Sequence, residues 1–195
     1  MKKSSLTMCT LFAALLVVSG NVPRLNAQEV NQDAMANLTG HYSARNFAAG
    51  AISRSDIDKI LAAGVRASSA NNRQPWHFTV VQDPALAKRI VSNVTDGNIL
   101  IIISAAVDGK NNGPAILDCA LATQSIYLAA QALGYGSRIY TGPMDTVNDK
   151  LKADLGLPSG HSAVALVRIG RLQQPADATS AASARKSLDT MVTYK

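Results

Sequence analysis

The residues most able to do chemistry lie in one short segment, residues 67–76, which read ASSANNRQPW. The segment places two adjacent amides, Asn71 and Asn72, an arginine and a glutamine just before the only tryptophan, Trp76. It contains few apolar residues, so it does not belong to the core. Polar loops held on a rigid scaffold commonly carry function. We therefore interpret residues 67–76 as a functional loop that binds a ligand through hydrogen bonds.

The usual signatures of catalytic side chains are missing. The three histidines, His41, His77 and His161, have no paired spacing with Cys, Asp or Glu, which argues against a zinc site. The sequence has no G-x-S-x-G, P-loop or G-x-G-x-x-G motif, and no pair of carboxylates stands out. We therefore predict neither a catalytic side chain nor a metal ion. If the protein is an enzyme, a cofactor carries the chemistry.

The elements that must hold this loop follow from capping residues and apolar periodicity. Ser53, with Asp56 three residues later, is typical of a capping box and predicts a helix that begins at residue 53. A strand over residues 77–82 follows the loop. Asp83-Pro84 then predicts the start of another helix, because Asp caps well and Pro is tolerated in the first turn.

The second half of the chain contains the two most apolar stretches. Residues 99–107 are almost continuously apolar, which suits a central strand buried on both faces. Residues 114–133 predict the longest helix, and its apolar circumference favours burial, in part against a second subunit. The full expectation is a single α/β or α+β domain with helices over 30–42, from 53, from 83, over 114–133 and 145–155, and strands over 77–82, 99–107, 137–140 and 162–169.

The first 27 residues have the pattern of a secretory signal. Lys2 and Lys3 precede an apolar centre over residues 11–18, and Ala27 is a suitable small residue before a cleavage point. The apolar run is too short to span a membrane. We therefore expect residues 1–27 to be a signal peptide, residues 28–195 to be the folded domain, and the mature protein to be periplasmic or secreted.

Charge and cysteine content narrow the function further. The predicted signal contains three basic residues and no acidic one, so its removal lowers the net charge from +6 to +3. This mild, scattered charge argues against nucleic-acid binding. Cys9 would leave with the signal, and the remaining Cys119 lies in an apolar helical run, which predicts a buried, unreactive thiol and no disulfide framework.

Residues 67–76 resemble the motif A-P-S-A-x-N-x-Q-P-W of the nitroreductase family of flavin enzymes. Aligned from Trp76, the positions Ser69, Asn72 and Gln74 match, whereas Ser68 replaces the usual proline. In that family the serine, the asparagine and their neighbours surround the flavin ring and its ribityl chain. The resemblance implies that these residues contact a flavin, while we expect Trp76 to pack against the core.

A second segment, residues 41–47, is similar to the opening motif R-R-S-x-R-x-F of the same family. Ser43, Arg45 and the phenylalanine match, and His41 and Tyr42 stand where arginine is common. The family uses this segment to hold the flavin phosphate and ribityl chain. A guanidinium group suits that role because its fork of N–H groups matches phosphate oxygens.

A third segment, residues 118–137, resembles the family helix D-x-G-x-A-x-Q-N-L-x-L-A-A-x-x-L-G-L-G-S, which lines the dimer interface. A plain buried helix would explain its apolar residues but not Asp118 and Gln124 at these offsets. Thr141 and Gly142 then fall where the family brings backbone against the flavin ring. Near the end of the chain, Arg185 falls where a basic residue often reaches the flavin phosphate.

Together these segments imply a nitroreductase-like fold, an α+β (α/β three-layer) domain with a mixed central sheet flanked by helices. They imply a homodimer that binds FMN at its interface. The implied activity is a ping-pong transfer of electrons from a reduced nicotinamide or another small-molecule donor to nitroaromatic or quinone-type acceptors. The implied cofactor-binding residues are His41, Tyr42, Ser43, Arg45, Ser69, Asn72, Gln74, Thr141, Gly142 and Arg185.

Two alternatives remain open at the level of the sequence. A specialised enzyme of the same family could use its flavin for dehalogenation or could fragment it. A protein of a different class could bind flavin or another small ligand, outside the cell, without turnover. Nicotinamide donors are not expected outside the cytoplasm, so export makes both alternatives relevant.

Overall fold

The computed structural model describes residues 32–107, 112–173 and 185–195. The expected signal peptide and the start of the domain at residue 28 lie outside these ranges. No helix among the described residues has the length and apolar character needed to cross a membrane.

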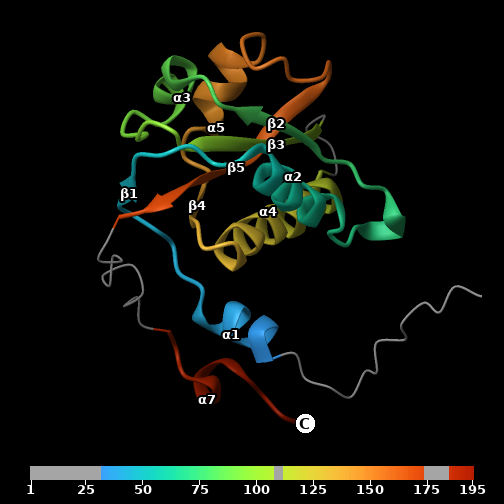
Figure 1. Cartoon of the computed structure of the whole chain (residues 1–195). Helices are drawn as coiled ribbons and strands as arrows, with labels where there is room; N and C mark the ends of the chain where they lie inside the picture. Colours follow the sequence, from blue (N-terminus) through green and yellow to red (C-terminus); the bar gives the residue numbers. More distant parts are fainter. Residues whose placement is uncertain (1–31, 108–111, 174–184) are drawn as a thin grey trace, which may run out of the picture. The chain divides into compact units, whose positions relative to one another are not determined.

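A five-stranded sheet organises the domain (Figure 1). Strand β5 (His161–Leu172) pairs with β1 (Phe47–Ala48), β3 (Ile99–Ala106) and β4 (Gly136–Tyr140), while β2 (His77–Val81) pairs with β3. Every one of these pairings is antiparallel. The sequence led us to expect a mixed sheet, and for the described strands that detail is wrong. The expected three-layer α/β architecture is confirmed.

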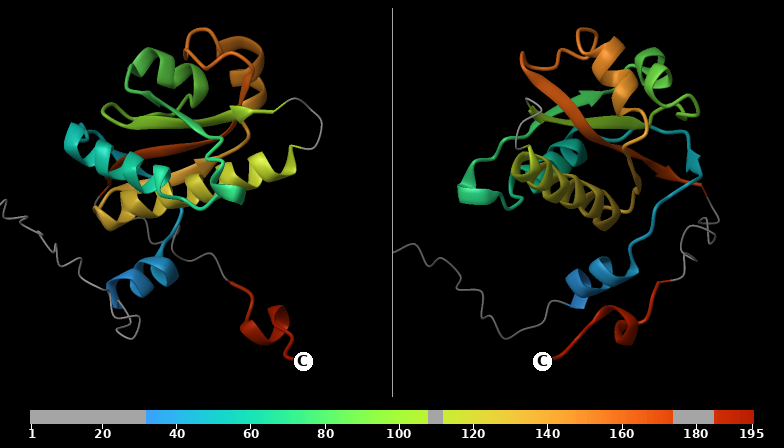
Figure 2. Two further views of the ribbon diagram at one scale, coloured as in Figure 1. Left: turned by 90° about the vertical axis from the view of Figure 1, so that its right-hand side faces the viewer. Right: turned by 180° about the vertical axis from the view of Figure 1, so that it is seen from behind.

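Helices cover both faces of the sheet, as the views in Figure 2 show. Strand β3 alternates between two apolar clusters, with Ile101 and Ile103 facing α2 (Arg54–Val65) and α4 (Gly113–Ala132). Leu100 and Ile102 face the other layer, which contains α3 (Pro84–Ile90), α5 (Met144–Thr146) and the wide turn Val147–Leu151. The expectation of a central strand buried on both faces is therefore confirmed.

The remaining elements are short. Helix α1 (Gln32–Gly40) precedes the sheet, a 3-10 turn (Ala70–Asn72) lies inside the functional loop, and α7 (Leu188–Met191) ends the described chain. The expected helix over 145–155 is present in part: α5 continues directly into the π-helical turn Val147–Leu151, and turns follow up to residue 156. This segment packs three apolar side chains, Met144, Val147 and Leu151, onto the sheet without needing a regular helix.

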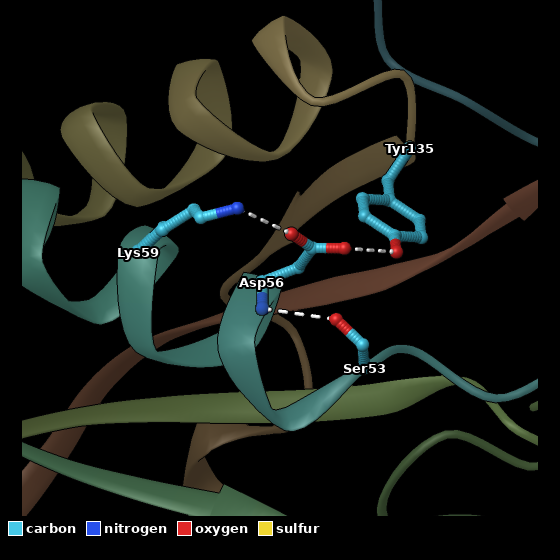
Figure 3. A network of polar contacts seen from close by, with 4 residues as sticks. All are labelled: Ser53, Asp56, Lys59 and Tyr135. Carbon is cyan, nitrogen blue, oxygen red and sulfur yellow. Dashed lines mark hydrogen bonds and ion pairs between the residues drawn. The ribbon is translucent and has the colours of Figure 1, made fainter.

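The predicted cap of α2 is present and also joins α2 to the end of α4 (Figure 3). The hydroxyl of Ser53 accepts the backbone N–H of Asp56 at 3.1 Å. The Asp56 carboxylate accepts the Tyr135 hydroxyl at 2.8 Å and the Lys59 ammonium at 3.1 Å. These hydrogen bonds, led by that of Tyr135, lower the pKa of Asp56.

Strand β1 was not expected from the sequence, and a buried arginine explains it. Arg168 is 2% exposed, and its guanidinium lies 4.1 Å from the centre of the Phe47 ring. The same guanidinium donates to Asn98 and Thr95, and these two side chains donate to the carbonyls of Ala48 and Phe47. Residues distant in sequence thus fix β1, and with it the end of segment 41–47.

Candidate functional site

The loop at residues 67–76, hereafter the motif loop, has an unusual backbone. Three of its residues other than glycine have positive φ: Asn71 at 52°, Asn72 at 54° and Gln74 at 47°. The conformation is restrained locally, because the Gln74 N–H donates to the Ser69 hydroxyl at 3.0 Å and the Gln74 side chain donates to the Asn72 side chain at 3.1 Å. Backbone of this kind persists only where its surroundings enforce it, and it is concentrated at ligand sites.

A buried carboxylate on α4, that of Asp118, binds the motif loop. The Ala70 N–H donates to Oδ1 of Asp118 at 3.0 Å, and Arg73 forms an ion pair with Oδ2 of Asp118 at 3.6 Å. Asp118 is only 2% exposed, and its Oδ2 has no hydrogen-bond donor within the described residues. The sequence marked Asp118 as unexplained by plain burial, and the structure shows that it supports the loop.

The motif loop borders an open cavity of about 410 Å³. Two of the expected site residues, Asn72 and Gln74, line it. Ser69 does not, because its hydroxyl is used inside the loop to hold Gln74. The remaining lining residues are Val65, Arg66, Ala67 and Ser68.

Segment 41–47 lies beside the other end of α4. The Gln131 side chain accepts the N–H of Tyr42 at 3.2 Å and donates to its carbonyl at 2.9 Å. The Ala44 N–H donates to the Ser137 carbonyl on β4 at 3.0 Å. With the backbone held in this way, Ser43 and Arg45 are exposed and have no hydrogen-bond or ion-pair partner in the described part of the chain.

His41 contacts Tyr127 of α4, and the charge of Arg185 also acts on that tyrosine. The His41 ring contacts the Tyr127 ring edge to face at 5.6 Å, and its Nδ1 lies 2.8 Å from the Leu38 carbonyl. Burial raises the pKa of Tyr127, while a hydrogen bond with Gln131 and the nearby charge of Arg185 act in the opposite direction. Arg185 is exposed, so its charge is available at the same end of α4 as segment 41–47.

Thr141 and Gly142 follow β4 and lie near the middle of α4. Thr141 lines a second cavity, of about 350 Å³, whose wall is mostly apolar. A methyl group placed on Gly142 would meet nothing within 4 Å, so a ligand can approach this backbone closely. The other lining residues of the cavity are Ile116, Ala120, Thr123, Gln124, Ile139, Val164 and Ala165.

The structure brings these groups together only in part. Strand β4 contains near its start the buried Ser137, whose carbonyl accepts the Ala44 N–H of segment 41–47, and is followed by Thr141, which lines the apolar cavity. The motif loop contacts Asp118, whereas segment 41–47 contacts Gln131. A helix rises 1.5 Å per residue, which places these two anchors about 20 Å apart along α4. Within one chain the motif loop and segment 41–47 therefore lie at separate ends of that helix.

Two further expectations about single residues are confirmed. Trp76 is half-buried and stacks on Phe78 with ring centres 6.4 Å apart, so it packs against the core. Cys119 is fully buried, and this burial, with the adjacent charge of Asp118, raises its pKa to about 11. A thiol in this setting is inert.

The described site belongs to a domain of known type. The model of the Nitroreductase family matches residues 38–107 and 93–171, which together span more than half of the chain. The chain belongs to the nitroreductase family. The resemblance seen in the sequence is thereby confirmed.

Individual relatives agree with this assignment. The chain is 39% identical over 129 residues to the Archaeoglobus fulgidus protein named "Putative NADH dehydrogenase/NAD(P)H nitroreductase", a match that covers 61% of this chain and 74% of that relative. Its fold is similar to that of a nitroreductase with bound FMN from Desulfitobacterium hafniense, at a TM-score of 0.69 and 20% identity, over 85% of this chain and all of that one. An FMN-dependent nitroreductase from Clostridium difficile has a TM-score of 0.63 at 25% identity, over 81% of this chain and 98% of that one.

Sequence reasoning missed two supporting residues of this nitroreductase domain as parts of the site. Gln131 holds segment 41–47, and Asp118 holds the motif loop. The available signal was their polarity within a helix that is otherwise apolar. A buried polar side chain in such a helix needs a partner, and here the partner is the backbone of a site segment in each case.

Proposed function

We propose that this nitroreductase-family protein binds FMN and is an FMN-dependent oxidoreductase. The observation that carries the proposal is the pair of exposed groups that β4 connects. The first end of β4 lies beside Ser43 and Arg45, whose side chains are exposed and have no polar partner among the described residues. At the other end it presents the open backbone of Gly142 beside the apolar cavity. A phosphate at the first end and a flat ring at the second match this arrangement.

The residues present fit the cofactor at each point. Arg45 and Ser43 would hold the phosphate, and Arg185 would add a second positive charge on the same side. Thr141 and Gly142 would lie against the ring. Both residues are exposed, and a methyl group on Gly142 would meet no atom of the described residues within 4 Å.

Bound FMN supplies the electron and hydride transfer, so the chain itself needs no acid, base or metal. The protein's contribution is to bind the cofactor, orient its ring and exclude water from one face. The apolar lining of the cavity beside Thr141 supports that role. Its size leaves room for one small planar substrate at a time.

We propose a ping-pong exchange in which a reduced nicotinamide, or another donor, and an oxidised acceptor occupy this cavity in turn. Nitroaromatic and quinone-type acceptors are planar and apolar, which suits a wall built from Ile116, Ile139 and Val164. The relatives' names, which combine NADH dehydrogenase with NAD(P)H nitroreductase, support the same donor and reaction class.

We also propose that the active form is a homodimer. Within one chain the motif loop lies about 20 Å along α4 from segment 41–47, too far apart for both to close around one ring. The first half of helix α4 exposes Ile116, Leu117 and Leu121, close to the Asp118 anchor of the motif loop. A second copy packed on this apolar face would bring its motif loop to the open end of the site.

Export completes the proposal. The pattern of residues 1–27 supports cleavage after Ala27 and an extracytoplasmic site of action. A donor other than a free nicotinamide would then be required in the cell. The site chemistry is the same with either donor, because both would use the cavity beside Thr141.

The test is the absorption spectrum of purified residues 28–195, before and after FMN is added and excess removed. Bound flavin should give bands in the visible region, and anaerobic NADH or NADPH should bleach them. A simple quinone should then restore the colour. A colourless protein that takes up no FMN would overturn the proposal, whereas bound flavin that no donor bleaches would favour a non-catalytic flavin carrier.

A further inference from the structure

We propose that Asp118 is a positioning residue, which sets the motif loop in the conformation that contacts the cofactor without touching the cofactor itself. The inference rests on the proposed function for its ligand, but its structural part does not depend on FMN. Asp118 is a buried carboxylate, and helix α4 could pack with an apolar residue in its place.

The burial of Asp118 requires an explanation. A carboxylate that is 2% exposed loses hydration, which is costly unless hydrogen bonds replace it. Asp118 lies on the most apolar helix of the domain, where an apolar residue would pack without this cost. Among the described residues, Asp118 has two polar partners, the Ala70 N–H and the Arg73 guanidinium, and both belong to the motif loop.

The loop, in turn, needs an external restraint. Positive φ at Asn71, Asn72 and Gln74 is uncommon for residues other than glycine, and each such residue is disfavoured without support. Inside the loop the support comes from Ser69, which accepts the Gln74 N–H. Asp118 is the contact that fixes the start of the 3-10 turn, at Ala70, to the rigid α4.

The two carboxylate oxygens of Asp118 differ in their hydrogen bonding. Its Oδ1 accepts a good hydrogen bond, but its Oδ2 has no hydrogen-bond donor within the described residues and only the longer ion pair with Arg73. The two oxygens therefore have separable tasks. Oδ1 accepts the backbone N–H of the turn, while Oδ2 is the oxygen that faces the Arg73 guanidinium.

This division predicts a graded series of variants. Asp118→Asn keeps an oxygen that can accept the Ala70 N–H and removes the charge. Asp118→Ala removes both and leaves the Ala70 N–H without its acceptor. We expect FMN affinity to fall about threefold in D118N and about thirtyfold in D118A, the latter corresponding to the loss of a buried hydrogen bond to a charged group.

A direct readout of loop position is available without any ligand. Trp76 is the only tryptophan of the chain and ends the motif loop, where it stacks on Phe78. If Asp118 positions the loop, its removal should shift Trp76 emission to longer wavelength and increase quenching by acrylamide. These changes should appear in D118A well below its unfolding temperature, and be smaller in D118N.

A matched control separates positioning from a loss of stability. Asp56 is another carboxylate that joins two elements, through its hydrogen bond with Tyr135 (Figure 3). It lies in the first turn of α2, whereas the motif loop follows the last turn of that helix. Asp56→Asn should lower the unfolding temperature while leaving Trp76 emission and FMN affinity at wild-type values.

The experiment measures FMN affinity by titration, Trp76 emission and unfolding temperature for wild type, D118N, D118A and D56N. Equal FMN affinity and unchanged Trp76 emission in both Asp118 variants would overturn the inference. So would FMN losses that follow unfolding temperature alike in D118N and D56N. If wild type fails to bind FMN, the proposed function falls, and the Trp76 measurements on the ligand-free proteins still decide whether Asp118 positions the loop.

Discussion

At the scale of single residues, the polar side chains of this protein have two separate tasks. The side chains of Gln131 and Asp118 hydrogen-bond to the backbone of segment 41–47 and of the motif loop, respectively. Ser43 and Arg45 are held by their backbone and have no partner in the described chain. Unpaired donors on a fixed backbone favour ligand binding, because the backbone loses little conformational entropy when the ligand binds.

Arg45 gives the sharpest prediction at this scale. Replacing Arg45 by alanine should weaken FMN binding about tenfold to a hundredfold, because a charge-assisted contact to phosphate is lost. Affinity for riboflavin, which lacks the phosphate, should change little. Fluorescence titration of both ligands measures this difference.

The control for Arg45 is Arg54→Ala. Arg54 is also exposed, but its guanidinium is engaged in an ion pair with Asp58 on its own helix. FMN affinity should be unchanged in this variant. Equal FMN affinity in wild type and R45A would show that segment 41–47 does not hold the phosphate.

The sequence names polar residues of the candidate site, and their contact with a ligand stays a prediction. Asn72 and Gln74 line a cavity, as their polarity in a loop suggested. Ser69 was predicted to face the ligand, but its hydroxyl binds inside the loop. The role of Asp118 depends on a contact across 48 residues, and no local pattern specifies such a contact.

At the scale of elements, the sequence predicted those helices and strands that have local signals, such as capping residues and apolar periodicity. Ser53 and Asp83 cap α2 and α3 as their sequence patterns indicated. Strand β1 could not be predicted, because two residues form it only through Arg168, Thr95 and Asn98. The antiparallel sheet was also beyond the sequence, since strand direction depends on how connections cross the layers.

The turn that precedes β3 packs closely against the backbone at Gly50, and a substitution can test this contact. Gly97 has φ +83°, and a methyl group added there would lie 2.4 Å from the carbonyl carbon of Gly50. Gly97→Ala should destabilise the fold by about 3 kcal/mol, because backbone strain combines with a backbone clash. Urea unfolding followed by circular dichroism measures the change.

Gly160 provides the matched control. It also has positive φ, at +76°, but a methyl group there would meet nothing within 4 Å. Gly160→Ala should therefore cost only about 1 kcal/mol, the conformational part of the penalty. Equal costs at both positions would show that the approach of Gly97 to Gly50 is not a tight contact.

At the scale of the whole molecule, the main unexplained feature is the apolar surface of α4. Leu117 is 62% exposed and Leu121 is 41% exposed, and their spacing of four residues places them on one face. The sequence predicted an apolar circumference for this helix, and a single chain covers only part of it. Exposed apolar patches of this kind mark association surfaces.

This surface lies beside Asp118, the anchor of the motif loop, so assembly and cofactor binding should be linked. Replacing both leucines by glutamate should convert the proposed dimer to a monomer, because two charges would have to be buried in each copy of the interface. The variant chain should still fold, since within one chain both side chains are exposed.

Sedimentation velocity measures the assembly state, and flavin titration measures the linkage. The monomeric variant should bind FMN at least tenfold more weakly, because the motif loop of the second copy would be missing from the site. Ala85→Glu is the control: Ala85 is exposed on α3, in the layer on the other side of the sheet, and its replacement should alter neither property. A double leucine variant that stays dimeric would place the interface elsewhere. A monomer with full FMN affinity would instead show that one chain forms the complete site.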